Sequence, residues 1–346
     1  MSPSAGTAAA WPLSNHGVRH RPARHRGLGA ARRSDGGGSW RFLRQWSLAP
    51  GRSRTDARGP RVDTQRGRRT VSVGDRVRIE ARRAAWAWGE AFAATQFALL
   101  RFTHRDAPIP LPVWHRAARR VRAATNRREL LVRSPLPTSA QQARLPAPLA
   151  AALGSTTLGH WSLDAETVGW LWRAGLRDAP RRIVECGGGV STVLGACLLR
   201  EQGDATSGHL VTLEQDAAYA ATLRERIAVL ALTPWVTVLD APIASDGNYR
   251  FDPAVVLDQL TGTADWLLVD GPRESRDLIV PSLAAVARTG TRWFLDDALD
   301  APYFANVEQW AEWPGLQTDG IVAVGKGLAT GMVTNPSAAT AAVLGR

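Results

Sequence analysis

Three consecutive glycines, residues 187–189, constrain this chain more than any other feature of its sequence. A short apolar run, 183–186, precedes them and contains Glu185, and a second apolar run, 193–199, follows. The pattern predicts a strand, a tight turn and a helix, an arrangement that brings backbone N–H groups and a helix N-terminus close to a ligand. Because Glu185 would repel a phosphate group, the turn favours a ligand that carries cationic and hydroxyl groups.

The formal charge of +12 is unevenly distributed along the chain. Arginine greatly outnumbers acidic residues in residues 1–150, whereas acidic residues are in excess in the remainder. Residues 1–75 are rich in Arg, Gly, Ser and Pro without hydrophobic periodicity, so we expect a disordered tail. Residues 76–150 are expected to form a basic helical appendage that ends in a Pro-rich linker. A basic arm for nucleic acid or an anionic membrane is the less favoured interpretation, because stacking aromatic residues do not recur among the arginines.

From about residue 155 the sequence alternates between strand-like and helix-like segments, beginning with Asp164 as the expected cap of a first helix. Apolar runs predict strands at 183–186, 210–213, 236–239, 266–269 and 293–295, with helices at 190–201, 216–230, 252–261 and 275–289. The runs 321–324 and 329–334 flank a Gly-rich turn and predict an antiparallel hairpin. We therefore expect an α/β fold over 155–346, a Rossmann-like, doubly wound, mostly parallel seven-stranded sheet.

Carboxylates recur at the ends of all five predicted parallel strands. They are Glu185, Glu214, Asp240, Asp270, and Asp296 with Asp297. Ligands of a doubly wound sheet bind beyond the carboxyl ends of its strands. A single acid at such a position would more often cap a helix or a turn, but buried strand ends seldom gather so many acids without a ligand or solvent to satisfy them. The recurrence therefore indicates a binding site at this edge.

The motif Glu185-Cys186-Gly187-Gly188-Gly189, followed by Ser191-Thr192, resembles the first motif of class I S-adenosylmethionine-dependent methyltransferases. The resemblance covers roughly residues 155–335 and is nearest to the small-molecule O-methyltransferases of the methyltransferase type 24 group. It implies S-adenosyl-L-methionine (SAM) as the cofactor. Nicotinamide dinucleotides are the nearest alternative, but their fingerprint requires a third glycine further along and an apolar residue in place of Glu185.

The resemblance also implies a role for each acid of the cofactor half. Glu185 would orient the amino-acid end of SAM, and Glu214 would accept hydrogen bonds from both ribose hydroxyls. Asp240 and Ala241 would lie beside the adenine. The residues expected to contact SAM are Glu185, Gly187, Gly188, Gly189, Ser191, Thr192, Glu214, Asp240 and Ala241.

Asp270, Asp296 and Asp297 resemble the acids that hold Mg²⁺ in divalent-metal-dependent O-methyltransferases, where the ion lowers the pKa of a bound substrate hydroxyl. The alternative is that these aspartates only cap turns. Arg273 occupies the position of a lysine base in some of those enzymes, and it cannot readily lose a proton, although it could bind an anionic substrate group. The candidate catalytic residues are Asp270, Arg273 and His160, for which an ordinary surface role is the alternative.

The expected reaction is methylation of an oxygen on a small molecule or sugar, with Mg²⁺ as a candidate second cofactor. The alternatives are an aminopropyltransferase that uses decarboxylated SAM, a nucleic-acid methyltransferase that uses the basic first half, and a non-catalytic SAM-binding module. Nucleic acid is the less expected partner, because the Asn/Asp-Pro-Pro-aromatic tetrapeptide of many amino-methylating DNA enzymes is missing from the sequence.

Cysteine usage and hydropathy lead us to expect a cytoplasmic protein without a transmembrane segment. Cys186 and Cys197 have neither a zinc-binding spacing nor the pattern of a disulfide framework. The longest mostly apolar run, 84–100, is short for a bilayer and contains Glu90, and no secretory signal pattern is recognised.

Overall fold

The computed structural model describes residues 95, 98–104, 106–115, 145–154, 156, 158–159, 162–203, 206, 208–245, 247–271 and 276–345. All of them belong to one compact unit of the chain. The expected tail, 1–75, and most of the expected appendage lie outside these residues, as do His160 and Arg273. Within the appendage, residues 98–104 and 111–115 are helical.

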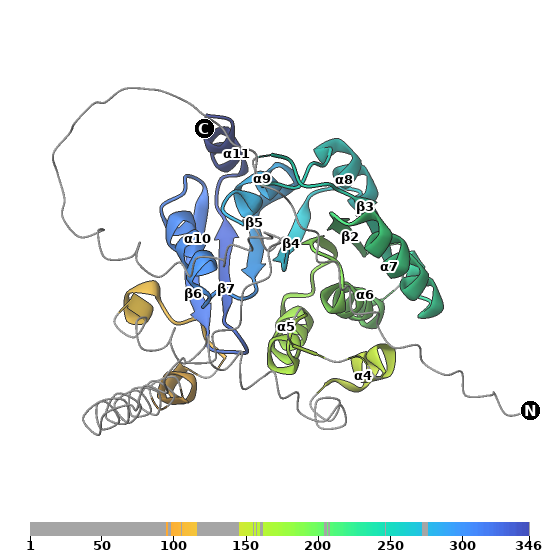
Figure 1. Cartoon of the computed structure of the whole chain (residues 1–346), viewed down its shortest axis with the longest axis horizontal. Coiled ribbons are helices and arrows are strands. Elements are labelled where there is room, and N and C mark those ends of the chain that lie inside the picture. The colour runs from red at the N-terminus through yellow and green to blue at the C-terminus, as the bar shows by residue number, and fades with distance from the viewer. Residues whose placement is uncertain are drawn as a thin grey trace, which may run out of the picture. The chain divides into compact units, whose positions relative to one another are not determined.

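A seven-stranded sheet forms the centre of the described structure, in the order β3-β2-β1-β4-β5-β7-β6 (Figure 1). The strands are β1 (Arg182–Cys186), β2 (His209–Glu214), β3 (Val236–Asp240), β4 (Ala264–Val269), β5 (Ala287–Leu295), β6 (Leu316–Val322) and β7 (Leu328–Val333). The first five strands pair in parallel, and β7 is antiparallel to both β5 and β6. The predicted Rossmann-like, doubly wound sheet with an antiparallel C-terminal hairpin is confirmed.

Helices cover both faces of the sheet and form two separate cores (Figure 1). One core contains residues of α4 (Ala147–Leu153), α5 (Ala165–Asp178), α6 (Val190–Gln202) and α7 (Ala217–Val229). The other contains residues of α8 (Pro253–Leu260), α9 (Ile279–Leu283), α10 (Ala301–Ala311) and α11 (Pro336–Leu344). Successive side chains of a strand point to opposite faces, so Trp293 and its neighbour Phe294 on β5 belong to different cores.

Local sequence explains how the helices α5 and α4 begin. Asp164 caps α5, as predicted, because its carboxylate accepts hydrogen bonds from the backbone N–H groups of Glu166 (2.8 Å) and Thr167 (2.9 Å). Residues 147–153 form α4 although they overlap the expected linker. Prolines 146 and 148 are compatible with this helix because they lie at its start, where their missing N–H groups have no helical partner.

The predicted helix at 275–289 is wrong in its second half. Within it, α9 is followed by a short 3-10 segment, Ala284–Val286, and β5 begins at Ala287, six residues before the predicted start at 293. The β-branched Thr289 and Thr291 favour the extended conformation. The hydroxyl of Thr291 also donates to the carbonyl of Ala264 on β4 (2.6 Å), which fixes the early part of the strand to the sheet.

The segment 106–115 covers the edge of the sheet beside β6. Ile109 exchanges two backbone hydrogen bonds with Ile321 (3.0 Å each), and the indole of Trp114 donates to the Ile321 carbonyl (3.1 Å). A Cβ on Gly320 would collide with the Ile109 carbonyl, so glycine is required there. This part of the appendage is therefore built into the sheet domain.

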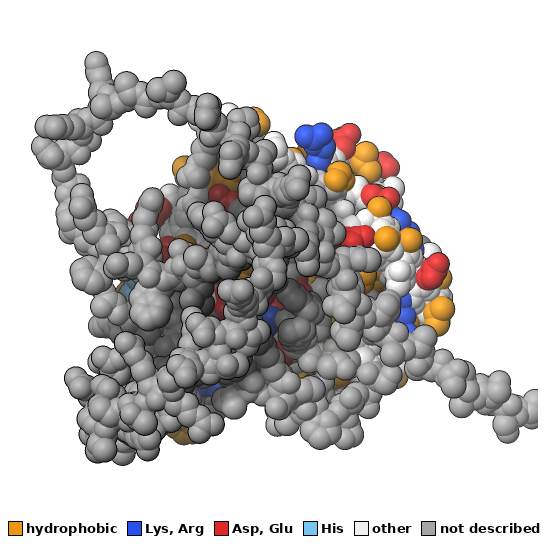
Figure 2. Space-filling view, viewed as in Figure 1, with side chains coloured by type: hydrophobic (Ala, Val, Ile, Leu, Met, Phe, Trp, Pro, Cys, Tyr) orange, Lys and Arg blue, Asp and Glu red, His pale blue; other side chains and the backbone are white. Residues whose placement is uncertain are grey.

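Over α7 and α8 the described surface carries interspersed acidic, basic and hydrophobic side chains (Figure 2). Cys186 and Cys197 are buried and are not joined by a disulfide. Among the described residues, no helix has the length and apolar character needed to cross a bilayer.

Candidate active site

The glycine turn after β1 is fixed by close backbone packing. Gly187 has a φ of +85°, and a Cβ on it would lie 2.8 Å from the backbone nitrogen of Gly271. Its N–H donates to the Leu213 carbonyl (3.0 Å), while the N–H groups of Asp270 and Gly271 both donate to the Cys186 carbonyl (3.0 Å). The turn is thus attached to the ends of both β2 and β4, which leaves no room for a side chain at Gly187.

Glu185 lies fully buried within β1, below this turn. Its Oε2 accepts hydrogen bonds from the hydroxyls of Thr192 (2.5 Å) and Thr212 (2.8 Å). Burial raises the pKa of Glu185 to about 7, although the hydroxyls of Ser191, Thr192 and Thr212 lower it. Its Oε1 has no hydrogen-bond partner among the described residues. A buried carboxylate with one unsatisfied oxygen fits a ligand that brings an N–H donor.

Glu214, at the end of β2, is also buried, and it faces the glycine turn. It accepts hydrogen bonds from the backbone N–H of Gly188 (2.9 Å) and from that of Asp216 (2.9 Å), one at each oxygen. Burial raises the pKa of Glu214, and the backbone N–H groups of Asp216, Gly188 and Gln215 oppose the rise. Each carboxylate oxygen keeps a second lone pair, so the group can still accept from two neighbouring hydroxyls of a ribose.

Asp240 is the register partner of Glu214 on the neighbouring strand β3. Its side chain is 55% exposed and forms an ion pair with Arg224 (2.7 Å). Ala241 is buried, and its N–H donates to the Glu214 carbonyl (2.8 Å). A cavity of about 400 Å³ lies beside Asp240 and is lined in part by Leu239, Phe251 and Val255. Asp240 and Ala241 therefore adjoin Glu214, whereas their predicted contact with adenine stays a prediction.

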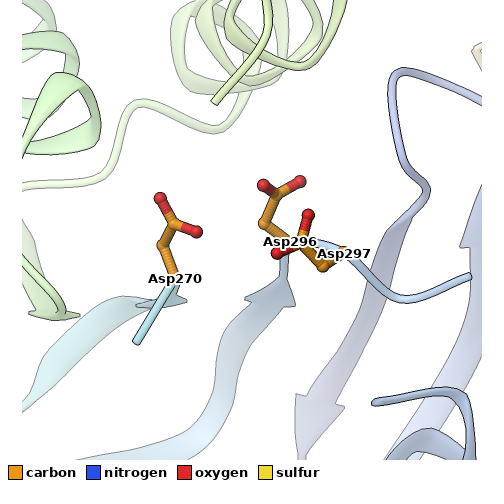
Figure 3. Close-up of side chains that lie close together, drawn as sticks. All are labelled: Asp270, Asp296 and Asp297. Carbon is orange, nitrogen blue, oxygen red and sulfur yellow. The ribbon is translucent and has the colours of Figure 1, made fainter. Parts of the chain in front are cut away.

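Three aspartates gather where β4 and β5 end (Figure 3). Oxygens of Asp270, Asp296 and Asp297 lie within 4.8 Å of one another, because the parallel register pairs Val269 with Leu295. Asp296 is 2% exposed, and neither of its carboxylate oxygens has a hydrogen-bond partner among the described residues. Burial raises the pKa of both Asp270 and Asp296, and the charge of Asp297 adds to each rise.

A buried arginine, which the sequence analysis did not identify, joins the ends of these two strands. Arg276 is 3% exposed, and its guanidinium donates to the backbone carbonyls of Asp270 (2.8 Å) and Asp296 (3.1 Å). It also lies 3.8 Å from the Asp297 carboxylate and 4.1 Å from the centre of the Tyr303 ring. No sequence pattern specifies a side chain that binds backbone carbonyls, so this residue could not be found from the sequence.

A second cation, also missed, reaches the aspartates from the turn between β6 and β7. Lys326 forms an ion pair with Asp297, and its Nζ lies 3.7 Å from an Asp296 oxygen. Burial alone would lower the pKa of Lys326, but the charges of Asp296, Asp297 and Asp270 raise it well above its usual range. The side chain is therefore an ammonium ion. Its only sequence signal is that it is the sole lysine among 43 basic residues.

Tyr249 is the third residue that the sequence analysis did not identify. It is buried, and its hydroxyl has no hydrogen-bond partner among the described residues. A Cβ on Gly271 would lie 2.6 Å from this hydroxyl, which places it beside the junction of the glycine turn with β4. Within the described part of the chain, the phenol is therefore a donor and acceptor that is not used by another side chain, and it lies near both Glu214 and Asp270.

The aspartate cluster fits Mg²⁺ in its donor atoms but not in its surroundings. Three carboxylates are suitable oxygen ligands for this ion. However, the Lys326 ammonium already contacts Asp297 and lies close to Asp296. A divalent ion at the same oxygens would be repelled by the ammonium at short range. The residues as arranged fit the ammonium, and the predicted magnesium site stays a prediction.

No family model matches the sequence, and curated proteins provide no match. Among solved structures the chain is similar to the SAH-bound methyltransferase PaMTH1 of Podospora anserina (15% identity; 55% of this chain and 89% of that one; TM-score 0.41). It is similar to the O-methyltransferase TomG of Streptomyces achromogenes in complex with SAM (18% identity; 55% of this chain and 91% of that one; TM-score 0.38). It is also similar to an O-methyltransferase of Bacillus cereus in complex with SAH (19% identity; 59% of this chain and 96% of that one; TM-score 0.39).

Proposed function

We propose that this chain is a SAM-dependent methyltransferase that methylates an oxygen of a small polar molecule, such as a sugar. The observation that supports it best is the pair of buried carboxylates, Glu185 and Glu214, on either side of the glycine turn. Glu214 keeps lone pairs for two ribose hydroxyls, and the unsatisfied Oε1 of Glu185 suits the ammonium of the methionine part. When bound, SAM supplies an electrophilic methyl group.

The acceptor side of the proposal rests on the ends of β4 and β5. Asp270 is partly accessible and can accept the proton of an acceptor hydroxyl while that oxygen is held near the methyl group. The acids and cations gathered at this edge, which include Asp297 and Lys326, favour a small polar acceptor over an apolar one.

The experiment that tests the cofactor assignment is calorimetric titration of the full chain with S-adenosylhomocysteine, decarboxylated SAM and NAD⁺. We expect S-adenosylhomocysteine to bind and NAD⁺ not to bind. Glu214→Gln should weaken the affinity for S-adenosylhomocysteine roughly tenfold to 100-fold, because a charge-assisted acceptor of two hydroxyls is lost. Glu225→Gln changes an exposed acid on α7 and is the matched control, which should leave the affinity unchanged.

Two outcomes would overturn the assignment. Binding of NAD⁺ in place of S-adenosylhomocysteine would make the turn a dinucleotide site. A preference for decarboxylated SAM would favour the aminopropyltransferase alternative. Once binding is established, labelled SAM and a panel of sugars and small hydroxylated molecules would identify the acceptor, and RNA and DNA at several salt concentrations would test the nucleic-acid alternative.

A further inference from the structure

The β6–β7 turn holds the only lysine of the chain in a defined place among acids. The backbone carbonyls of Lys326 and Gly327 accept hydrogen bonds from the N–H groups of Leu299 (3.1 Å) and Ala298 (2.9 Å). These two donors directly follow the aspartate pair in the sequence. The backbone of the turn is therefore attached to the segment that carries Asp297, which fixes where the lysine side chain begins.

Glycines on both sides of the lysine are required by this attachment. Gly325 has a φ of +49°, and a Cβ on it would collide with the Asp164 carboxylate. Gly327 has a φ of +92°, and a Cβ on it would collide with the Leu299 side chain. The turn thus fits against α5 on one side and against the end of β5 on the other. Lys326 reaches the aspartates from a turn that has no freedom to withdraw.

We propose that Lys326 is the resident cation of the cluster formed by Asp270, Asp296 and Asp297, and that it makes this site independent of a divalent metal. The ammonium contacts Asp297 and lies 3.7 Å from Asp296, where a bound metal ion would have to lie. Arg276 adds a second fixed positive charge 3.8 Å from Asp297. Two tethered cations compensate most of the charge of three carboxylates without any ion from solution.

The choice of lysine supports this assignment. All other basic residues of the chain are arginine. A guanidinium is a planar group, whereas an ammonium is a compact point charge that can donate in three directions. A compact cation is what a small gap between carboxylates can accommodate. Lys326 is thus a positioning residue, whose ammonium group holds the Asp297 carboxylate in place beside Asp296.

The first test is titration of the full chain with Mn²⁺, with the free ion measured by electron paramagnetic resonance, in the presence and absence of S-adenosylhomocysteine. The wild-type chain should bind no stoichiometric Mn²⁺ at the cluster. Lys326→Met should bind one Mn²⁺ at least about 100-fold more tightly than the wild type, because the repelling charge is gone. Lys326→Arg keeps the charge and should still prevent stoichiometric Mn²⁺ binding, although the guanidinium fits the gap less well than the ammonium. Lys326→Met combined with Asp296→Asn should lose the new site.

A second test uses the wild-type fold and does not depend on recovering Lys326→Met. Because the chain has one lysine, amine acetylation labels only Lys326 and the N-terminal amine, and peptide mass spectrometry reads the Lys326 peptide separately. The lysine should be strongly protected in the folded chain, equally with and without Mg²⁺. Asp297→Asn removes its ion-pair partner and should speed the labelling.

The proposal is overturned if the wild-type chain binds one Mn²⁺ that Asp296→Asn abolishes, or if Mg²⁺ exposes Lys326 to acetylation. Either result would mean that the ion displaces the lysine and that the cluster is a metal centre. A folded Lys326→Met variant with no gain in Mn²⁺ affinity would equally refute it. None of these readouts requires methyl transfer, so they can fail while the proposed function stands.

Discussion

Two groups of acids lie along the same edge of the sheet, and they are stabilised in different ways. Among the described residues, Glu185 and Glu214 around the glycine turn have only uncharged hydrogen-bond partners, which are threonine hydroxyls and backbone N–H groups. The aspartates at the ends of β4 and β5 are instead accompanied by Arg276 and Lys326. A cationic ligand would therefore stabilise the ionised form of the first group, whereas Lys326 and Arg276 already supply positive charge to the second.

This difference indicates that the two groups of acids along the edge suit different ligands. Buried carboxylates without a cation are costly, so they favour a ligand that brings positive charge or several donors. A cluster with built-in cations gains less from an external ion. The comparison therefore supports the proposal of a cationic cofactor at the first group and a neutral, polar acceptor at the second.

Of the changes that this comparison predicts, Arg276→Met should cause the largest loss of stability. Removing the guanidinium leaves two carbonyls and a crowded set of carboxylates without their buried partner, and the free energy of unfolding should fall by about 3 kcal/mol. Urea unfolding measures it. Arg173→Met is the matched control, because Arg173 is 58% exposed in its ion pair with Asp106 and should cost less than about 1 kcal/mol. Equal losses in the two variants would show that the buried cation does not stabilise the aspartate half.

The next effect concerns the backbone of the cofactor half. Gly187→Ala places a Cβ against the Gly271 backbone at a φ of +85°, so we expect a loss of about 2 kcal/mol and weaker binding of S-adenosylhomocysteine. Gly169→Ala is the control within α5. Its Cβ would meet only the flexible end of Arg173 at 3.6 Å, and the helix should gain up to about 1 kcal/mol. If Gly187→Ala and Gly169→Ala were equally stable, the glycine turn would be able to move away from β4 and accommodate the added Cβ.

The two halves also differ in how far the sequence predicts them. The glycine turn, Glu185 and Glu214 lie within about 30 residues, and strand periodicity was enough to bring them together. The contact between Asp297 and Lys326 depends on the insertion of β7 between β5 and β6, which no local pattern specifies. Arg276 acts through backbone carbonyls, so its role emerges only from the register of β4 and β5. Apolar runs predict burial, whereas cations that neutralise a distant cluster require the assembled topology.

The last expected effect, similar in size to that of Gly187→Ala, is the pH dependence contributed by Glu185. Its pKa is about 7 in the folded chain and 4.5 as the ordinary value, so the folded state binds this proton more tightly than the unfolded state. Stability should therefore fall as the pH rises from about 4.5 to 7 and then level off. Over pH 5 to 7 the wild type should lose about 2 kcal/mol relative to Glu185→Gln, which cannot ionise. Urea unfolding of both proteins across this range measures the difference. A constant difference would mean that Glu185 ionises as it does in water, and the contrast between an uncompensated and a neutralised group of acids would be lost.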